Sequence, residues 1–311
     1  MNSGIFFEDI IRPLSRSKFL QDFFDQKHFY HEGEASRFRD LLSSDQLKEF
    51  IKISPLWNEA TLRLYHQGHA ILPDHFCKPS STLDQGITLR PDFDLILSHL
   101  AQGATLVAND IGTLTPGLRN ISHQLAENLE APVQANLYYS VKAQPGFLSH
   151  FDVHDVFVFH LEGEKKWRLY EGKAVAPIQH PLFNHLSQEM HEAQKGPLLT
   201  EIHLKPGSFL YIPRGMYHDA LALTDHSLHI SFGVTRPIGL KAITLLFEAM
   251  VYEKIARQNV PFFDDSHHFS EYLKNLGKCA NDILNNSHFQ AQLKAQLTSE
   301  YKRPPKIEAF Q

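Results

Sequence analysis

Three residues offer metal ligands at a spacing that suits a single ion. His150 and Asp152 stand at positions i and i+2, so at the edge of a strand their side chains share one face. A third ligand is available downstream in His218, where the run IPRGMYH is expected to leave a strand through a turn. Two imidazoles and one carboxylate on one side of an ion leave the opposite positions open, as non-haem iron(II) oxygenases require. Taken alone, the His-x-Asp pair also fits a surface histidine beside a turn aspartate.

Lys165 lies where a charged side chain is not expected. In the strand predicted from Glu164 to Tyr170 it shares a face with Trp167 and Leu169. A buried ammonium is costly unless it is paired, and a bound anion such as the free end of a dicarboxylate would pair with it. The alternative is a partly exposed lysine whose stem packs on the sheet.

Polar side chains also share a face one strand earlier. Asn136, Tyr138 and Ser140 alternate along that strand. Tyr138 is placed to donate a hydrogen bond to the same carboxylate that Lys165 would bind.

The elements that must position these residues are mainly strands, from Val133 to about Thr235. Short apolar or alternating runs are separated by glycine and proline turns. The expected strands contain residues 136–139, 156–159, 167–170, 202–204, 209–212 and 228–231. Many short strands with such turns favour a closed or sandwiched antiparallel architecture, such as a jelly roll.

Helices are expected on both sides of these strands. Residues 1–130 indicate short helices with irregular connections, and Pro91 is expected in the first turn of one of them. Thr115-Pro116 should begin another, with one apolar face; that face comprises Leu118, Ile121, Leu125 and Leu129. Three more helices are expected after Pro237. The first carries an apolar stripe of Leu240, Ile243, Phe247 and Met250.

The predicted organisation is therefore mainly β with helical additions. Residues 1–130 form a helical lead packed on the barrel, 131–237 the barrel, and 238–311 a helical segment that dimerises. Net charge is −5, which gives no reason to expect direct nucleic-acid binding. The N-terminus does not read as a signal peptide and no window suits a membrane helix. With two distant cysteines, the chain is expected in the cytoplasm.

The sequence resembles a known group over roughly residues 10–240. The run NLYYSVKAQPGFLSHFDVHDVFVFHLEGEKKWRLYEG, then LKPGSFLYIPRGMYHDA and HSLHISFG, is similar to the JmjC-type cupin-like oxygenases. Within them it resembles the ribosomal oxygenases, which hydroxylate residues in ribosomal proteins. The resemblance implies a double-stranded β-helix, Fe(II) as cofactor, 2-oxoglutarate as cosubstrate, and a protein or peptide substrate such as a ribosomal protein.

The resemblance also implies roles for individual residues. His150, Asp152 and His218 match the iron ligands. Lys165 matches the residue that binds the distal carboxylate of 2-oxoglutarate. Tyr138 matches a tyrosine that assists it, and Asn136 and Ser231 match polar positions near the cosubstrate. His229 lies beside this set, where a structural role is equally expected.

Some features depart from the group, and rival functions follow from the residues. Leu148-Ser149 replaces a common Ala-Pro pair, and Phe147 stands where some relatives place a hydroxyl. Residues 239–311 show three helices and no wing-like strands, so a complete winged helix is not expected. The rivals are a hydroxylase of a small molecule or peptide, a metal cupin that does not use 2-oxoglutarate, and a non-catalytic metal-binding cupin.

Overall fold

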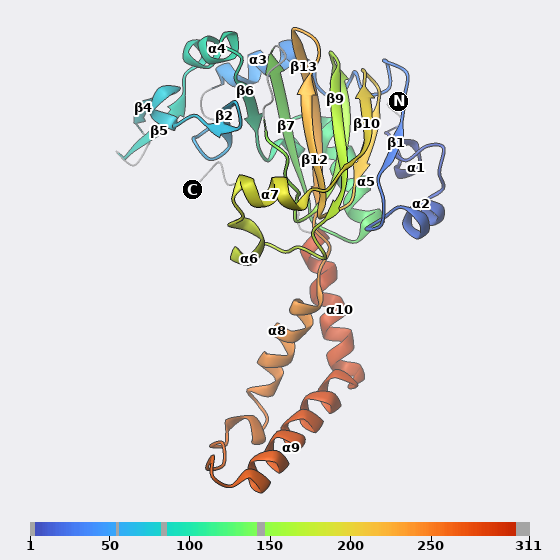
Figure 1. Ribbon diagram of the computed structural model, residues 1–311, viewed down its shortest axis with the longest axis vertical. Helices are drawn as coiled ribbons and strands as arrows, with labels where there is room; N and C mark the ends of the chain where they lie inside the picture. Colours follow the sequence, from blue (N-terminus) through green and yellow to red (C-terminus); the bar gives the residue numbers. More distant parts are fainter. Residues whose placement is uncertain (1–3, 54–55, 82–85, 142–146, 303–311) are drawn as a thin grey trace. The chain divides into compact units, whose positions relative to one another are not determined.

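The computed structural model describes residues 4–53, 56–81, 86–141 and 147–302. They divide into two compact units, one ending at Thr235 and the other beginning at Arg236. All the strands that the structure describes lie in the first unit, and the second is helical (Figure 1). Among the helices within these ranges, none is long and apolar enough to cross a membrane.

Two antiparallel sheets form the first unit (Figure 1). The larger has eight strands, in the order β1 (Phe29–His31), β11 (Phe209–Ile212), β8 (Asp155–Glu162), β13 (His226–Val234), β7 (Val133–Val141), β6 (Thr105–Ala108), β2 (Leu62–His66) and β3 (His69–Ala70). The smaller has the order β10 (Leu198–Leu204), β9 (Lys165–Lys173), β12 (Met216–Ala222). A separate hairpin pairs β4 (Cys77–Ser81) with β5 (Ile87–Pro91). The expected antiparallel, mainly β architecture is confirmed.

The two faces of the large sheet have different partners because side chains alternate along each strand. In β8, Val156 and Val158 pack with Trp167 and Leu169 of the small sheet in one apolar cluster. The side chain between them, Phe157, belongs to a second cluster on the opposite face. The small sheet therefore covers the inner face of the large one, and the candidate ligands lie at this two-sheet core.

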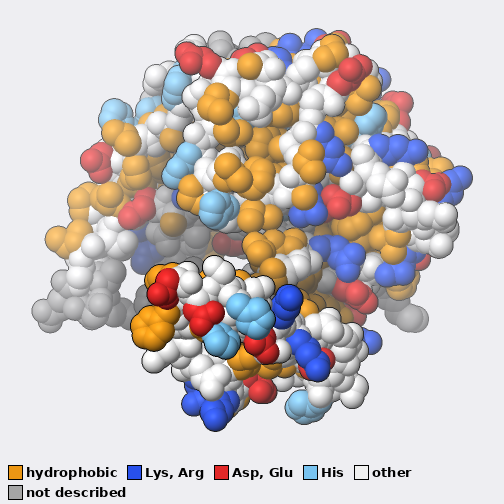
Figure 2. Space-filling model, turned by 60° about the horizontal axis from the view of Figure 1, so that its bottom comes forward, with side chains coloured by type: hydrophobic (Ala, Val, Ile, Leu, Met, Phe, Trp, Pro, Cys, Tyr) orange, Lys and Arg blue, Asp and Glu red, His pale blue; other side chains and the backbone are white. Residues whose placement is uncertain are grey.

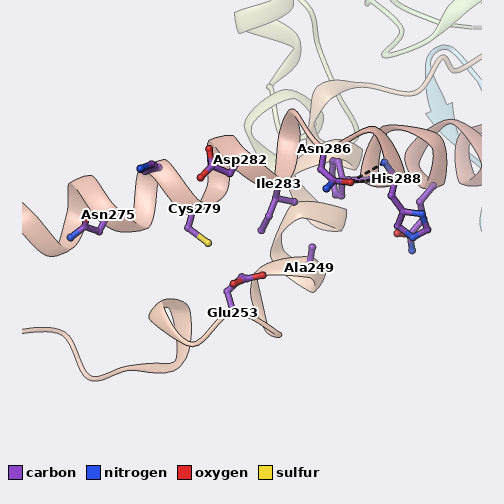
Figure 3. Close-up of a pocket in the computed structure, with 11 residues that line it drawn as sticks. Ala249, Glu253, Asn275, Cys279, Asp282, Ile283, Asn286 and His288 are labelled. Atoms are coloured by element: carbon purple, nitrogen blue, oxygen red, sulfur yellow. Dashed lines mark hydrogen bonds between the residues drawn. The ribbon is translucent and has the colours of Figure 1, made fainter.

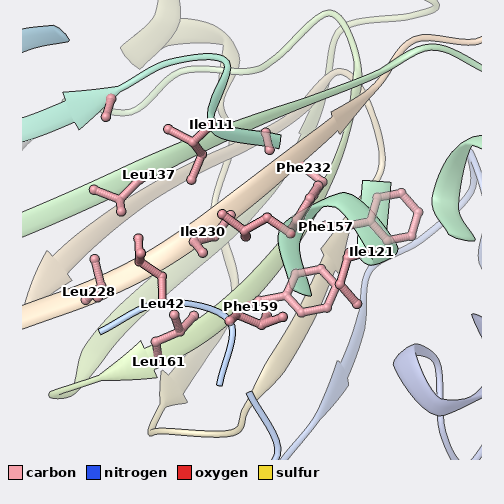
Figure 4. Packing of buried hydrophobic residues seen from close by; sticks show 14 of the residues in the cluster. Leu42, Ile111, Ile121, Leu137, Phe157, Phe159, Leu161, Leu228, Ile230 and Phe232 are labelled. Atoms are coloured by element: carbon pink, nitrogen blue, oxygen red, sulfur yellow. The ribbon is translucent and has the colours of Figure 1, made fainter. Parts of the chain in front are cut away.

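Helices from the N-terminal part of the chain cover the outer face. They are α1 (Phe7–Ile10), α2 (Arg16–Asp22), α3 (Ser44–Lys52), α4 (Phe93–Ala101) and α5 (Pro116–Leu129). Figure 4 shows Ile121 of α5 packed with Phe157 and Phe159 of β8. Each buried aromatic or aliphatic side chain contributes roughly 1.5–3 kcal/mol, so this cover stabilises the sheet substantially.

Helix α5 begins where the sequence predicts. Its N-cap Thr115 accepts a hydrogen bond from the amide of Leu118 at 3.2 Å, and Pro116 occupies the first turn. The four apolar residues of its expected face are all buried. The predicted start and face of this helix are confirmed.

The N-terminal region also contains strands that the sequence interpretation missed. Strands β1, β2, β3 and β6 join the large sheet, so this part of the chain is not a purely helical lead. Pro91 is the last residue of β5, and the helix after it is capped by Asp92, whose side chain accepts from the Leu95 amide at 3.1 Å. The expected first-turn role of Pro91 is therefore wrong.

Two short helices, α6 (Pro181–Asn184) and α7 (Gln188–Gln194), connect β9 to β10. The second unit contains α8 (Gly239–Met250), α9 (Ser266–Leu284) and α10 (Ser287–Lys302), which confirms the three expected helices. An ion pair of 3.1 Å between Lys241 and Glu300 joins α8 to α10. Figure 2 shows apolar side chains on the surface of this unit among charged ones. Residues 303–311 of the expected C-terminal segment lie outside the described ranges.

Candidate metal centre

The structure brings the three predicted ligands together. One donor atom from each of His150, Asp152 and His218 lies within 4.8 Å of the other two. His150 lies between β7 and β8. As the sequence predicts, a strand, β11, ends at Ile212 and leads into a turn, and His218 lies in β12 directly after that turn. The two histidines form an isolated antiparallel bridge in which each backbone amide donates to the other's carbonyl, at 3.1 and 2.8 Å.

Backbone carbonyls orient both imidazoles toward a common point. Nδ1 of His150 lies 2.8 Å from the Leu148 carbonyl, and Nδ1 of His218 lies 3.0 Å from the Met216 carbonyl. Because a carbonyl only accepts, each Nδ1 carries the proton and each Nε2 keeps its lone pair. Nε2 of His218 lies 3.5 Å from Asp152 Oδ2. The donor set is therefore two neutral imidazoles and a carboxylate, which suits a divalent transition metal.

The charge states of these side chains suit the same role. Burial, followed by the neighbouring His150 imidazole, lowers the pKa of His218 to about 4, so its imidazole is neutral near pH 7. Burial would raise the pKa of Asp152, but the imidazoles of His154, His150 and His218 outweigh it and leave that pKa below its ordinary value. The carboxylate is thus ionised without a metal.

A glycine turn holds the segment that carries Asp152. Gly215 has φ +81°, and its amide donates to the Asp152 carbonyl at 2.8 Å. A Cβ at this position would lie 2.1 Å from the carbonyl oxygen of Ala174, so only glycine fits. The Pro-Arg-Gly turn before His218 therefore also positions the carboxylate ligand.

Lys165 is buried as its strand face predicted. Its side chain is 4% exposed, and Nζ lies 3.1 Å from Ser140 Oγ and 3.3 Å from His229 Nδ1. Neither partner is an acid. Burial consequently lowers the pKa of the ammonium from 10.5 to about 7. The lysine is thus a buried cationic group without an anionic partner among the described residues.

His229 connects Lys165 to Tyr138. The imidazole of His229 stacks on the Tyr138 ring with centroids 4.8 Å apart and planes 4° from parallel. Burial, then the charge of Lys165, lowers the pKa of His229 well below its ordinary value, so it is neutral. Burial, then the charge of Asp152, raises the pKa of the Tyr138 phenol, which stays protonated and able to donate.

Trp167 lies between His229, the partner of Lys165, and the metal ligand His218. Its ring centroid is 5.7 Å from that of His218 and 5.6 Å from that of His229. The indole is 5% exposed, and its Nε1–H has no hydrogen-bond partner among the described residues. An unpaired buried donor costs about 1–3 kcal/mol, which a bound acceptor would recover.

The remaining predicted residues lie on the adjoining strands. Asn136 and Ser231 are cross-strand neighbours in β7 and β13, two positions from the Tyr138–His229 pair. Asn136 Oδ1 accepts from the Asp110 amide at 3.3 Å. Two groups were missed from the sequence: Ser140, although its strand face was recognised, and the indole donor of Trp167. Period-two alternation could have flagged both.

A two-sheet antiparallel barrel with a His-Asp-His donor set defines the cupin-like class of metal-binding folds. Residues 114–241 match the family model for the JmjC domain. This region is similar to a JmjC domain, and the expected resemblance to this group is confirmed.

Relatives agree with this assignment. The chain is 25% identical over 235 residues to the bifunctional lysine-specific demethylase and histidyl-hydroxylase NO66 of Dictyostelium discoideum, covering 71% of this chain and 41% of that protein. It is 25% identical over 241 residues to the uncharacterized protein YxbC of Bacillus subtilis, covering 73% and 70%. The chain thus spans less than half the length of the NO66 relative.

A solved structure shares the fold across nearly the whole chain. The ribosomal oxygenase YcfD from Escherichia coli, in complex with cobalt and 2-oxoglutarate, superposes with a TM-score of 0.61 at 17% identity. The match covers 94% of this chain and 73% of that one. It confirms the fold class, including the presence of C-terminal helices.

Proposed function

We propose that this protein is an Fe(II)- and 2-oxoglutarate-dependent oxygenase that hydroxylates an amino-acid side chain. The observation that carries the proposal is the combination of the His150, Asp152 and His218 donor set with a buried lysine, Lys165, that has no acid partner among the described residues. A metal cupin that does not use 2-oxoglutarate has no need of such a lysine. The similarity to a JmjC domain and the names of NO66 and YcfD support the same function.

The residues fit both groups. Two imidazoles with free Nε2 lone pairs and an ionised carboxylate would hold the iron. When bound, the iron would let dioxygen oxidise 2-oxoglutarate to succinate and carbon dioxide and hydroxylate a C–H bond, with one oxygen atom going to each product. Lys165 would bind the distal carboxylate of the cosubstrate and take a proton from solvent when it does so. Tyr138 would donate to the same carboxylate, with Asn136 and Ser231 nearby on β7 and β13.

Aromatic rings would exclude water around this arrangement. The Phe147 ring lies 6.0 Å from that of His150 and 4.6 Å from that of Tyr65. Trp167 fills the space between His218 and His229 and would offer its free N–H to the cosubstrate. Because these aromatic rings carry no net charge and would keep water out, the charges of the metal ligands and of Lys165 would interact more strongly with the bound metal and cosubstrate.

The substrate class follows from the relatives. NO66 is named a histidyl-hydroxylase and YcfD a ribosomal oxygenase, so we propose a side chain of a protein, such as a ribosomal protein, as the target. Such a substrate would place the enzyme in the cytoplasm. A small molecule or free peptide is the alternative that the assay below separates.

We further propose a division of the chain into three parts: residues 1–130, which cover the barrel, the barrel of residues 131–237, and the helical segment, predicted as 238–311, which dimerises. Phe289 is the only hydrophobic residue buried among those described after Arg236, whereas Phe247 is 67% exposed. Figure 3 shows a hollow between Asn275, Cys279 and Ile283 of α9 and Ala249 and Glu253 at the end of α8. A second copy would cover these apolar surfaces. Light scattering at micromolar concentration should give twice the chain mass, and a monomer mass refutes the dimer.

The function is tested by turnover. Purified protein with Fe(II), 2-oxoglutarate and ribosomal proteins should form succinate and add one oxygen atom to a protein residue, detected by mass spectrometry. Succinate formation without a modified protein would direct the search to small molecules. Metal binding without succinate would indicate a non-catalytic cupin and refute the proposal.

Lys166→Gln supplies the matched control. Lys166 neighbours Lys165 but pairs with Glu201 on the opposite face of β9 at 3.2 Å. This variant should keep turnover, whereas Lys165→Ala should lose it.

A further inference from the structure

Asp219 is a buried carboxylate that the proposed chemistry does not use. It follows His218 in β12 and is 5% exposed. Its oxygens accept hydrogen bonds from the Tyr170 hydroxyl at 2.6 Å, Arg168 Nε at 2.7 Å and Ser149 Oγ at 2.9 Å. A carboxylate buried in this way is costly unless several donors surround it. We call these four residues the Asp219 cluster.

The cluster lies directly behind the two histidine ligands. In an antiparallel pair, the residues flanking the His150–His218 bridge stand opposite each other, so Ser149 faces Asp219. Alternation turns these two side chains to the face opposite the ligands. The Ser149–Asp219 hydrogen bond therefore joins the same two segments that carry the ligands.

This link matters because the backbone pairing is short. The two segments share one bridge and the Gly215–Asp152 backbone hydrogen bond, and a slip of one residue would turn each ligand to the wrong face. On the other side of the bridge, the rings of Phe151 and Tyr217 touch with centroids 5.2 Å apart. These rings pack on each other, whereas within the described part of the chain the only side-chain hydrogen bond across the bridge is that from Ser149 to Asp219.

The cluster also anchors the bridge to the small sheet. Asp219 stands opposite Arg168 of β9, and His218 stands opposite Leu169. Ser149 is held from a third side, because Gln188 of α7 donates to its carbonyl at 3.2 Å and Lys195 Nζ donates to its hydroxyl at 3.3 Å. Asp219 of β12 thus accepts hydrogen bonds both from β9 and from the segment that carries His150.

We propose that Asp219 is a positioning residue that fixes the register and separation of His150 and His218, and thereby sets the affinity of the metal centre. The inference rests on the proposed metal centre. Partners of this kind behind metal ligands typically change metal affinity by 10- to 100-fold when they are removed.

The test uses Co(II), titrated into the metal-free full-length protein and followed by its visible absorption. Asp219→Ala should weaken Co(II) binding by about 10- to 100-fold. Ser149→Ala removes the link across the bridge without changing any charge, and it should weaken binding by about 3- to 10-fold. Ser149→Ala therefore distinguishes an effect on the register of the two segments from an effect of losing the negative charge beside His218. It also provides the test if Asp219→Ala does not fold.

Tyr217→Phe is the matched control. Tyr217 precedes His218, is buried, and bonds through its hydroxyl to Gln194 at 3.3 Å, but that bond does not cross the bridge. This variant should bind Co(II) within about twofold of wild type. If folded Ser149→Ala and Asp219→Ala also bind within twofold, the proposal is overturned. A general loss of stability would lower the melting temperature of all three variants alike.

A second readout does not depend on the metal. The amides of His150 and His218 donate across the bridge, so their hydrogen exchange reports its opening. In metal-free protein, Ser149→Ala should speed exchange at these two amides at least fivefold, and Tyr217→Phe should not. Wild type that fails to bind Co(II) refutes the proposed metal centre, whereas unchanged exchange in Ser149→Ala refutes the role of Asp219.

Discussion

Lys165→Met is expected to make the protein more stable while it weakens cosubstrate binding. The wild-type side chain is buried, its partners among the described residues are Ser140 and His229, and burial lowers its pKa from 10.5 to about 7. Each pKa unit corresponds to about 1.4 kcal/mol, so the buried amine costs up to about 4 kcal/mol at pH 7. Methionine fills a similar volume without a charge. Allowing for the lost hydrogen bonds, we expect a gain of about 2–4 kcal/mol at pH 7.

The pH dependence has a defined sign. Between pH 7 and 10.5 the unfolded lysine is protonated and the folded one is neutral, so the unfolded state binds more protons and wild-type stability rises with pH. The stability deficit relative to Lys165→Met is largest below pH 7. It should shrink by about 2 kcal/mol between pH 7 and 9. Urea denaturation of both metal-free proteins at pH 7, 8 and 9 measures this difference, and effects of other titrating groups cancel between them.

Cosubstrate affinity should change in the opposite direction. Binding a carboxylate requires the charged ammonium, so the affinity of wild type for 2-oxoglutarate should fall as the pH rises above 7. Lys165→Met should lose roughly 2–4 kcal/mol of binding free energy at pH 7 while Co(II) binding persists. Lys165→Arg should retain part of the affinity because its guanidinium also binds carboxylates. Equal stability and equal affinity in wild type and Lys165→Met would show that Lys165 is neither a strained cation nor a cosubstrate ligand.

Three further variants test the centre. His218→Ala should lose tight Co(II) binding and all turnover yet keep its circular dichroism spectrum; full activity would make another histidine, such as His226 or His229, the third ligand. Trp167→Phe should weaken 2-oxoglutarate binding about tenfold, measured by calorimetry, because it removes a free donor; unchanged affinity would mean that the indole faces no ligand. Gly215→Ala should destabilise the protein by about 2–4 kcal/mol in urea denaturation, since its Cβ meets the Ala174 carbonyl; wild-type stability would contradict the close contact.

The sequence predicts best where a local pattern decides the structure. Alternation in the strand containing Lys165, Trp167 and Leu169 correctly placed all three on the buried face. A cap followed by proline correctly placed the start of α5. In both cases the residues that carry the signal are neighbours along the chain.

Prediction failed where distant segments decide the structure. Strand β6 has only four residues, all buried, and its identity as a strand comes from pairing with β2 and β7. No local pattern indicates that Asp219 is buried, and its partners Ser149 and Tyr170 approach it from other segments. Neither kind of contact leaves a periodic pattern in one stretch of sequence.

The sharing of one sheet between the N-terminal region and the family domain limits how the chain can be shortened. A fragment beginning at residue 114, where the JmjC match starts, would lack the strands that pair with β7 and β11. It would also expose Phe157 and Phe159, which pack against Phe19 and Phe38 from the N-terminal region. Open strand edges beside bare aromatic surface favour aggregation. Expression of the isolated family domain should therefore yield insoluble protein, and domain boundaries drawn from sequence families alone would mislead the choice of fragment.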